Sequence, residues 1–195
     1  MEKLVLATHN AGKIREFRSV LEPLGFDVLP IRQVCPHITE PEETGTTFAE
    51  NACLKAEYYM KASGLPCLAD DSGILADALN GRPGVYSARY AGPDCDDEAN
   101  NRKLIADLSA FPPEKRTVRY VCVLALLFPD GRRILEEGQC QGILRDFYAG
   151  HNGFGYDPLF YVPSLGKTMA ELSMDEKNAI SHRGRALKQL VEALS

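Results

Sequence analysis

The sequence predicts an α/β protein whose β-sheet mixes parallel and antiparallel strands. Short apolar runs alternate with segments in which apolar residues recur at helical spacing. Helix-length segments separate some of these runs, as between parallel strands, whereas a tight turn at residues 129–131 joins one pair as a hairpin. The chain has 195 residues, 45% of them hydrophobic, and shows no repeat or linker, so we expect one domain over residues 1–195.

The first third of the chain predicts two strands and a helix between them. An apolar strand at residues 4–7 leads through a polar loop into a helix, which Asn10 can cap and Gly25 can end. Residues 26–30 form the second strand. The polar, proline-containing segment at residues 33–45 is expected to be a loop.

The next two elements are predicted by a capping pattern and by a change to polar residues. Thr47 and Glu50 have the spacing of a capping box, and Gly64 stops the helix that follows. The strand at residues 67–69 is expected to end at the polar residues 70–73.

The second half of the chain has the same mixture of elements. They are a loop-rich segment at residues 81–97, a helix at 97–108, strands at 117–128 and 134–144, a glycine-rich loop at 150–158, a short strand at 159–162, and a helical region that opens with a second capping box at 173–176.

Composition excludes several classes of protein. With 22 basic and 27 acidic residues, the formal charge of −5 disfavours DNA and RNA as partners. The longest apolar stretch, residues 120–128, is too short to span a membrane, and the N-terminus becomes polar too early for a signal peptide. We therefore expect a cytoplasmic protein. Six cysteines without a C-x-x-C pair argue against a zinc site and predict reduced thiols.

Residues Thr8–Lys13 are a candidate phosphate-binding loop. Between a strand and a helix they would present backbone N–H groups, a hydroxyl, an amide and an ammonium group, which suit phosphate oxygens. The Walker A spacing is missing, and a simple capped helix start with a solvated Lys13 is the commoner explanation of such a segment.

Asp70 and Asp71 are adjacent carboxylates at the end of an apolar strand. Such a pair is costly unless a divalent cation, a proton or hydrogen bonds use its charge, and Mg²⁺ accepts carboxylates together with phosphate oxygens. A turn in which the aspartates bond the backbone explains the pair equally well. One glutamate of the acidic segment at residues 40–45 could be a second metal ligand, although such segments are usually solvated surface.

Two later segments suit a nucleotide. The aromatic residues of 153–158 are flanked by glycines, which would let a purine stack on a ring, although packing into the core is the alternative. Lys177, His182 and Arg183 carry donors that could bind phosphates or base carbonyls. The alternative is that this segment is simply a solvated basic turn. Ser181 and His182 are adjacent and do not suggest a hydrolase triad.

The ordered set of motifs resembles the Ham1-like inosine/xanthosine triphosphate pyrophosphatases. The motifs that carry the resemblance, spread over residues 4–194, are T-x-N-x-x-K at 8–13, ETGTTF-x-ENA at 43–52, ADDSG at 69–73, PGVYSARY at 83–90, FGYDP at 154–158 and SHRG at 181–184. The resemblance implies an elongated mixed α/β fold with two lobes flanking a nucleotide cleft, a homodimer, and Mg²⁺-dependent hydrolysis of ITP, dITP and XTP to monophosphate and pyrophosphate.

The resemblance also implies roles for individual residues. Asp71 would be the proton acceptor and, with Glu40, a metal ligand; Glu43 is the rival of Glu40. The substrate-binding residues it implies are Thr8, His9, Asn10, Ala11, Gly12, Lys13, Ser72, Phe154, Gly155, Tyr156, Asp157, Lys177, His182 and Arg183. His9 departs from the family pattern, in which many relatives have glycine, so the loop backbone could differ or His9 could add a phosphate contact.

Two other functions fit part of the pattern. A nucleotide sensor would use the glycine-rich and basic loops but would not need the paired aspartates. A Maf-like pyrophosphatase shares the strand, loop and helix at the N-terminus and the reaction, but it explains the segment around Ser181 to Arg183 less well.

Overall fold

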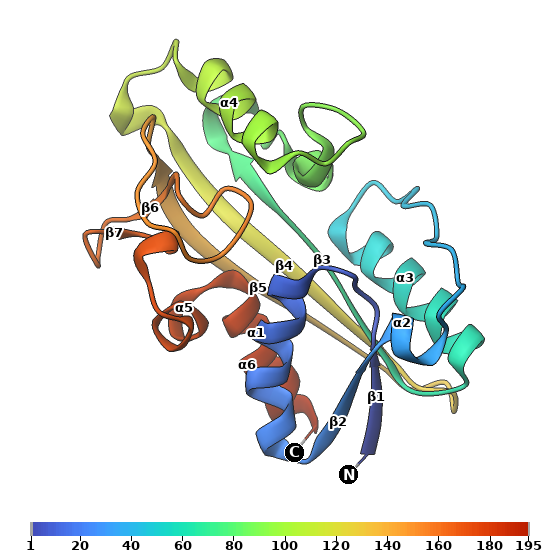
Figure 1. Ribbon diagram of the computed structural model, residues 1–195. Helices are drawn as coiled ribbons and strands as arrows, with labels where there is room; N and C mark the ends of the chain where they lie inside the picture. Colours follow the sequence, from blue (N-terminus) through green and yellow to red (C-terminus); the bar gives the residue numbers. More distant parts are fainter. Residues whose placement is uncertain (1, 195) are drawn as a thin grey trace. The chain divides into compact units, whose positions relative to one another are not determined.

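The computed structural model describes residues 2–194 and has the predicted mixed α/β architecture (Figure 1). One sheet has the strand order β2-β1-β3-β4-β5-β6-β7. Its strands are β1 (Glu2–Leu6), β2 (Phe26–Pro30), β3 (Cys67–Ala76), β4 (Thr117–Leu127), β5 (Arg133–Leu144), β6 (Phe160–Val162) and β7 (Lys167–Thr168). The α-helices are α1 (Ala11–Leu21), α2 (Ile31–Val34), α3 (Phe48–Ser63), α4 (Asp97–Leu108), α5 (Met174–Ile180) and α6 (His182–Leu194).

Strand directions confirm that the sheet is mixed. β1 pairs in parallel with β2 and with β3, and α1 and α3 lie in the connections along the chain. β6 pairs antiparallel with β5 and with β7. Helical crossovers therefore build the first part of the sheet, whereas the described connections of β6 to β5 and to β7 contain no α-helix.

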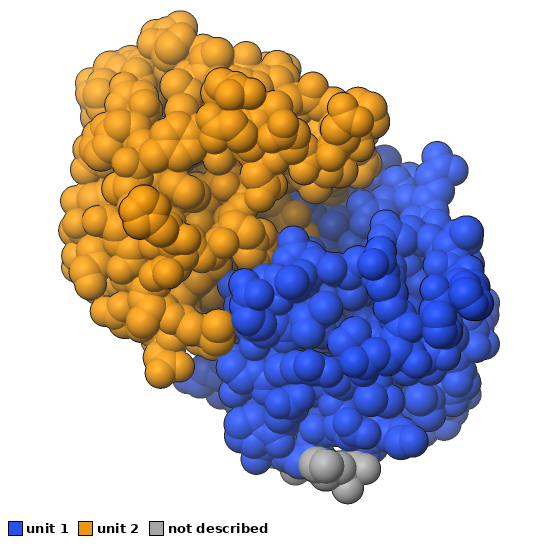
Figure 2. All heavy atoms as spheres, in the orientation of Figure 1, with its two compact units in different colours: residues 1–71, 122–138, 183–195 blue, residues 72–121, 139–182 orange. Residues whose placement is uncertain are grey.

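The chain divides into two compact units (Figure 2). Unit 1 consists of residues 1–71, 122–138 and 183–195, and unit 2 consists of residues 72–121 and 139–182. The two units match the two lobes implied by the family resemblance, whereas the treatment of residues 1–195 as a single domain stays a prediction.

Unit 1 has an apolar layer on each face of its strands. Leu4 and Leu6 of β1 and Leu68 of β3 belong to a cluster that contains residues of α1 and α6. Val5 of β1 belongs to a second cluster, with Cys67 and Ala69 of β3 and residues of α3. Because successive side chains of a strand point to opposite faces, neighbouring residues of β1 and β3 pack against different helices.

Unit 2 has its own core. It combines residues of β3, α4, β4, β5 and β6 with the segments around them, and Ile74, Leu104 and Phe160 are fully buried in it. Apolar burial of this kind is what holds the irregular segments of this unit in place.

The predicted helix boundaries are confirmed where a capping signal was present. Asn10 caps α1 by accepting a hydrogen bond from the Lys13 N–H. Gly25, which was expected to end this helix, instead ends the short 3₁₀ turn that follows Leu21, with φ of +91°. Thr47 and Glu50 form the predicted capping box of α3, and Gly64 ends that helix with φ of +70°. α4 starts at Asp97 as predicted, after an Asp96 cap.

Three expectations about secondary structure were wrong. β3 does not end at Asp70; it continues as a strand to Ala76. The helical region that begins after Ser173 is interrupted at Ser181, which separates α5 from α6. The segment expected to be a loop begins with the single helical turn of α2.

All six cysteines are free thiols, as expected. Among residues 2–194, none of the helices has the length and the apolar character needed to cross a lipid bilayer.

Candidate active site

The predicted phosphate loop connects β1 to α1 in unit 1. Asn10 has an extended backbone, and its Oδ1 accepts from the Lys13 N–H at 3.1 Å, while the Thr8 hydroxyl accepts from the Asn10 N–H at 3.2 Å. These bonds fix the turn that starts the helix. The first-turn N–H groups of a helix have no carbonyl partner within the helix, and the helix dipole makes this end positive. Residues 8–13 can therefore hold an anion.

Asp70 is the centre of a buried ionic network on the α1 and α6 side of β3. The Lys13 Nζ lies 3.1 Å from its Oδ1 and 2.9 Å from its Oδ2. The Arg183 Nη2 donates to Asp70 Oδ2 at 3.1 Å, and the Arg183 Nη1 donates to Glu16 at 2.5 Å. Asp70, Glu16 and Arg183 are all buried, so this network ties α1, β3 and α6 together.

The charges around Asp70 keep it ionised. Burial alone would raise the pKa of its carboxyl group, but Lys13, Arg183 and Lys55 together hold that pKa well below its usual range. The pKa of Arg183 is raised because the attraction of Asp70 and Glu16 outweighs the burial of the guanidinium group. Asp70 is therefore a permanent counter-ion for two cations rather than a proton acceptor.

Asp71 meets a different set of groups, all carried by α3 or by the segment before it. Its Oδ2 accepts from the Asn51 Nδ2 at 3.2 Å, and its Oδ1 accepts from the Lys55 Nζ at 3.4 Å. Lys55 also donates to Glu43 at 2.7 Å, so one ammonium group bridges two carboxylates. Gly45 lies so close to Asn51 that a Cβ at this position would be 2.6 Å from the Asn51 Oδ1.

The surroundings of Asp71 raise the pKa of its carboxyl group. Burial is the largest cause, and the negative charge of Glu43 adds to it, whereas Lys55, Lys13 and the hydrogen bond from Asn51 act in the opposite direction. A carboxylate with a raised pKa is a stronger base than an ordinary aspartate. Asp71 thus has the protonation chemistry expected of a proton acceptor.

The two candidate metal-ligand glutamates differ in their partners. Glu40, the predicted ligand, is exposed, and its Oε1 lies 3.2 Å from the His9 Nε2. Glu43, its rival, shares Lys55 with Asp71. Among the described residues 2–194, no three or more histidine, cysteine, aspartate or glutamate side chains form a metal-binding group. The protein therefore offers a pair of carboxylates rather than a complete cage.

The predicted nucleotide loop lies in unit 2 and is held by Asp157. The Oδ2 of this residue accepts from the Phe154 N–H at 3.0 Å and from the Lys177 Nζ at 2.8 Å. Gly153 has φ of +79°, and a Cβ there would lie 2.1 Å from the same oxygen, so only glycine fits. The Lys177 Nζ also lies 4.9 Å from the centre of the Phe154 ring.

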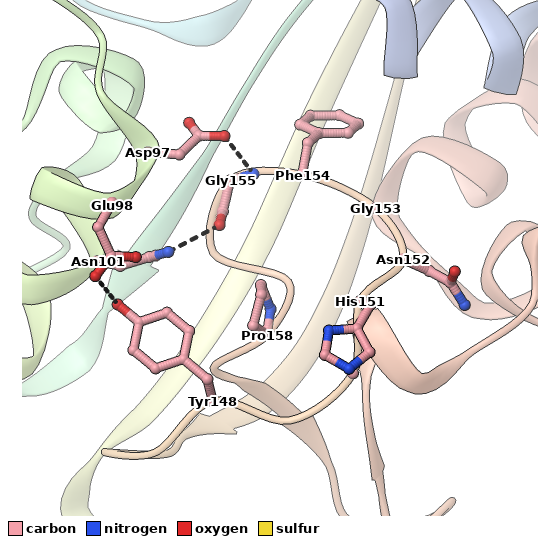
Figure 3. A pocket seen from close by; sticks show the side chains of 11 residues that line it. Asp97, Glu98, Asn101, Tyr148, His151, Asn152, Gly153, Phe154, Gly155 and Pro158 are labelled. Atoms are coloured by element: carbon pink, nitrogen blue, oxygen red, sulfur yellow. Dashed lines mark hydrogen bonds between the residues drawn. The ribbon is translucent and has the colours of Figure 1, made fainter.

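The α4 helix holds the same loop at Gly155. Asp97 accepts from the Gly155 N–H at 2.9 Å, and the Asn101 Nδ2 donates to the Gly155 carbonyl at 3.1 Å (Figure 3). The Tyr156 hydroxyl donates to the Ser87 carbonyl at 2.7 Å. The loop has little regular structure, and side-chain hydrogen bonds define its shape.

A cavity of about 560 Å³ lies beside this loop within unit 2 (Figure 3). Its wall contains Asp97, Glu98, Tyr148 and His151, together with Phe154 and Gly155 of the predicted nucleotide set. The other predicted nucleotide residues do not line it. Two carboxylates and no lysine or arginine are among the described residues that line it.

The predicted site residues fall into two groups within the units. Unit 1 brings Lys13, Asp70, Asp71 and Arg183 together through the networks described above, and unit 2 brings Phe154, Asp157 and Lys177 together. His182 belongs to unit 2, although Arg183 belongs to unit 1. Ser72 is half-buried and follows Asp71 directly in β3.

Sequence reasoning missed four residues that contact the predicted site. Asn51 and Lys55 lie four residues apart on α3, which places them on one face of that helix, and this spacing could have identified them. Glu16 is a glutamate at helical spacing among the apolar residues of α1. Tyr120 lies in a long apolar strand, and no sequence pattern distinguishes it from a core residue.

Comparisons with known proteins show the family. A model of the Ham1 family matches residues 4–193. The dITP/XTP pyrophosphatase of Bacillus cereus is 50% identical over 196 residues, which covers 100% of this chain and 95% of that protein. The corresponding protein of Desulforamulus reducens is 51% identical over 193 residues, covering 99% and 96%. A structure of a HAM1 protein from Coxiella burnetii superposes with a TM-score of 0.89 at 43% identity, covering 100% of this chain and 98% of that one.

Proposed function

Because the chain belongs to the Ham1 family, we propose that it hydrolyses deaminated purine nucleoside triphosphates, such as dITP and XTP, to the monophosphate and pyrophosphate. ITP is the third expected substrate. The observation that carries this proposal is the environment of Asp71, a buried carboxylate of raised pKa that is held by Asn51 and Lys55. Relatives named for this activity cover the full chain at about half identity, which supports the same reaction.

In the proposed reaction Asp71 accepts a proton from the water that attacks the α-phosphorus. Its raised pKa increases its strength as a base, and its bonds to Asn51 and Lys55 hold both carboxylate oxygens in place. Positioning of the Asp71 carboxylate against the attacking water and the α-phosphorus supplies a further part of the rate enhancement. Ser72, the next residue in β3, is proposed to contact the substrate.

The proposed phosphate site is the loop from Thr8 to Lys13. The N-terminus of α1 contributes N–H groups and a positive dipole end, and Lys13 contributes a full positive charge. Asp70 holds the Lys13 ammonium at 2.9 Å, which restricts the lysine to one position beside β3. His9, Ala11 and Gly12 complete the loop. Pyrophosphate is a good leaving group only when its charge is balanced, and these groups supply that balance.

Mg²⁺ is the proposed cofactor, and its carboxylate donors fit what this chain offers. Lys55 bridges Glu43 and Asp71, so these two carboxylates already share one cation, and hard carboxylate oxygens are the donors that Mg²⁺ accepts. We propose Asp71 and Glu43 as the ligands, in place of the Glu40 expected from the sequence, because Glu40 pairs with His9. The ion supplies charge neutralisation of the phosphate oxygens.

The base is proposed to bind in unit 2 at Phe154, Gly155, Tyr156 and Asp157, with Lys177 and His182 as the polar groups near it. The contact of Arg183 with the base, which the family resemblance implies, stays a prediction. The buried side chains of Lys177 and His182 are donors, and a 6-keto purine presents an acceptor where adenine presents an amino group. A site built to hydrogen-bond one particular base can discriminate against another by about 10⁴-fold.

A panel of nucleotides assayed with and without Mg²⁺ tests the proposal. We expect monophosphate and pyrophosphate from dITP, ITP and XTP, with kcat/KM far above that for ATP. Release of orthophosphate would indicate a different hydrolase, preference for a pyrimidine or modified nucleotide would indicate a Maf-like activity, and binding without product would indicate a sensor. The homodimer and the cytoplasmic location expected from the sequence stay predictions, and sedimentation equilibrium tests the first of them.

A further inference from the structure

Tyr120 of β4 lies between two rings in unit 2. The centre of its ring is 4.3 Å from that of Phe160 with an interplanar angle of 9°, and 4.5 Å from that of His182 with an angle of 22°. The side chains of all three residues are buried. The imidazole of His182 is thus stacked on Tyr120, which is itself stacked on the core residue Phe160.

The hydroxyl group of Tyr120 reaches a second residue of the predicted nucleotide set. It lies 3.2 Å from the Asp157 Oδ1, which is the oxygen opposite the one bound by the Phe154 N–H and by Lys177. The side chain of Tyr120 therefore contacts both Asp157, which shapes the nucleotide loop, and His182.

We propose that Tyr120 is a positioning residue that sets purine selectivity by fixing the ring plane of His182 and the carboxylate of Asp157. The inference rests on the proposed function, in which His182 faces the base. Stacking fixes the plane of the imidazole, and the plane fixes the direction in which a ring N–H can donate. A donor that turns away from a 6-keto oxygen loses the geometry that distinguishes this oxygen from an amino group.

A role in core packing alone does not account for both contacts. The face of Tyr120 against Phe160 belongs to the core, and this contact would serve stability with any aromatic ring. The other face and the hydroxyl group are directed to His182 and Asp157. Stability and selectivity can therefore be separated by experiment.

The test compares Tyr120→Met and Tyr120→Phe with the wild type, and uses Tyr90→Leu as a control. Tyr90 packs against the same core and donates its hydroxyl to Asp107, away from the predicted nucleotide residues. The readout is the ratio of kcat/KM for ITP to that for ATP, because a loss of folded protein lowers both values equally.

Tyr120→Met removes the ring and the hydroxyl group, and we expect the ITP to ATP ratio to fall about tenfold. Tyr120→Phe keeps the ring, so its ratio should stay between that of Tyr120→Met and that of the wild type. Tyr90→Leu should leave the ratio unchanged. An unchanged ratio in folded Tyr120→Met would overturn the inference, as would an equal fall in Tyr90→Leu.

A spectroscopic measurement tests the stacking without activity. The chain has four histidines, and the Cε1–H signal of His182 can be assigned by its absence in His182→Gln. Because the imidazole lies over the Tyr120 ring, this signal should be shifted upfield in the wild type and in Tyr120→Phe, and should return toward the ordinary position in Tyr120→Met. Absence of the upfield shift in the wild type would overturn the inference, even if the Tyr120→Met variant did not fold.

The two proposals fail in different ways. If the wild type releases no pyrophosphate from ITP, the proposed function is wrong and the inference falls with it. If the wild type prefers ITP while folded Tyr120→Met prefers it equally, the proposed function stands and only the inference about Tyr120 is wrong.

Discussion

Asp70 and Asp71 are consecutive residues of β3 that bind side chains from opposite faces of the sheet. Asp70 continues the face of Leu68 and meets Lys13 of α1 and Arg183 of α6. Asp71 continues the face of Cys67 and Ala69 and meets Asn51 and Lys55 of α3. The alternation of a strand therefore places two identical carboxyl groups in two different environments, and their pKa values move in opposite directions.

The first prediction concerns Asp71 as the base. Asp71→Asn removes the proton acceptor but keeps the size of the side chain, so kcat for ITP should fall by about 10²-fold or more. Binding of the nucleotide should persist, because the phosphate loop is unchanged. Steady-state kinetics and calorimetric titration measure the two effects. Asp130→Asn, in the exposed turn before β5, is the control for the same chemical change. Near-normal kcat in Asp71→Asn would exclude Asp71 as the base.

The second prediction concerns the stability that Asp70 provides. Asp70→Asn leaves Arg183 and Lys13 without their shared counter-ion, and breaking a buried ion pair in this way costs about 3–5 kcal/mol. Urea unfolding gives the change in the free energy of unfolding. The control is Asp77→Asn, which breaks the exposed pair with Arg119 and should cost less than about 1 kcal/mol. Equal small losses in both variants would contradict a structural role for the Asp70 network.

The third prediction is the pH dependence of that stability. The pKa of Asp70 is lowered by folding, so the unfolded chain binds a proton at this residue more readily than the folded protein does. The stabilisation is therefore complete above the ordinary value of 3.8 and is lost as the pH falls below it toward the lowered pKa. The difference in unfolding free energy between wild type and Asp70→Asn should shrink over this acidic range. A difference that grows on acidification would contradict the assignment.

The fourth prediction concerns Lys55 and the base. Lys55 lowers the pKa of Asp71 against the effect of burial, so Lys55→Gln should raise that pKa further. The acidic limb of the profile of kcat/KM against pH should move to higher pH. The control is Lys61→Gln, which removes a lysine of the same helix. The ion pair of Lys61 with Glu57 is exposed, so this variant should leave the acidic limb of the pH profile in place. Two variants with superimposable profiles would argue against coupling of Lys55 to the base.

The fifth prediction separates the two candidate metal ligands. If Glu43 is the ligand, Glu43→Gln should raise the Mg²⁺ concentration needed for half-maximal activity by about tenfold, whereas Glu40→Gln should not. Both glutamates lie in the same segment before α3, so each variant is the control for the other. Titration of activity with Mg²⁺ measures the effect. The opposite order would restore Glu40, the ligand expected from the sequence.

Much of the fold could be predicted from the sequence because its signals are local. The capping box at Thr47 to Glu50, the asparagine cap of α1 and the glycine stop at Gly64 each act within one helical turn, and the structure has all three. The end of β3 could not be predicted in the same way. Asp70 to Gly73 read as a turn because polar residues rarely continue a buried strand, but partners distant in sequence satisfy the two aspartates within the strand.

The sequence by itself determined the fold class, the family and the segments that carry the candidate chemistry, because motifs and capping signals are local properties of the chain. Only the tertiary structure decided how the side chains are combined. It paired Asp70 with Arg183, which lies 113 residues away, and Asp71 with Lys55. It also brought Tyr120 to His182 and Asp157. Contacts of this kind depend on which face of a strand meets which helix, and no local pattern encodes that choice.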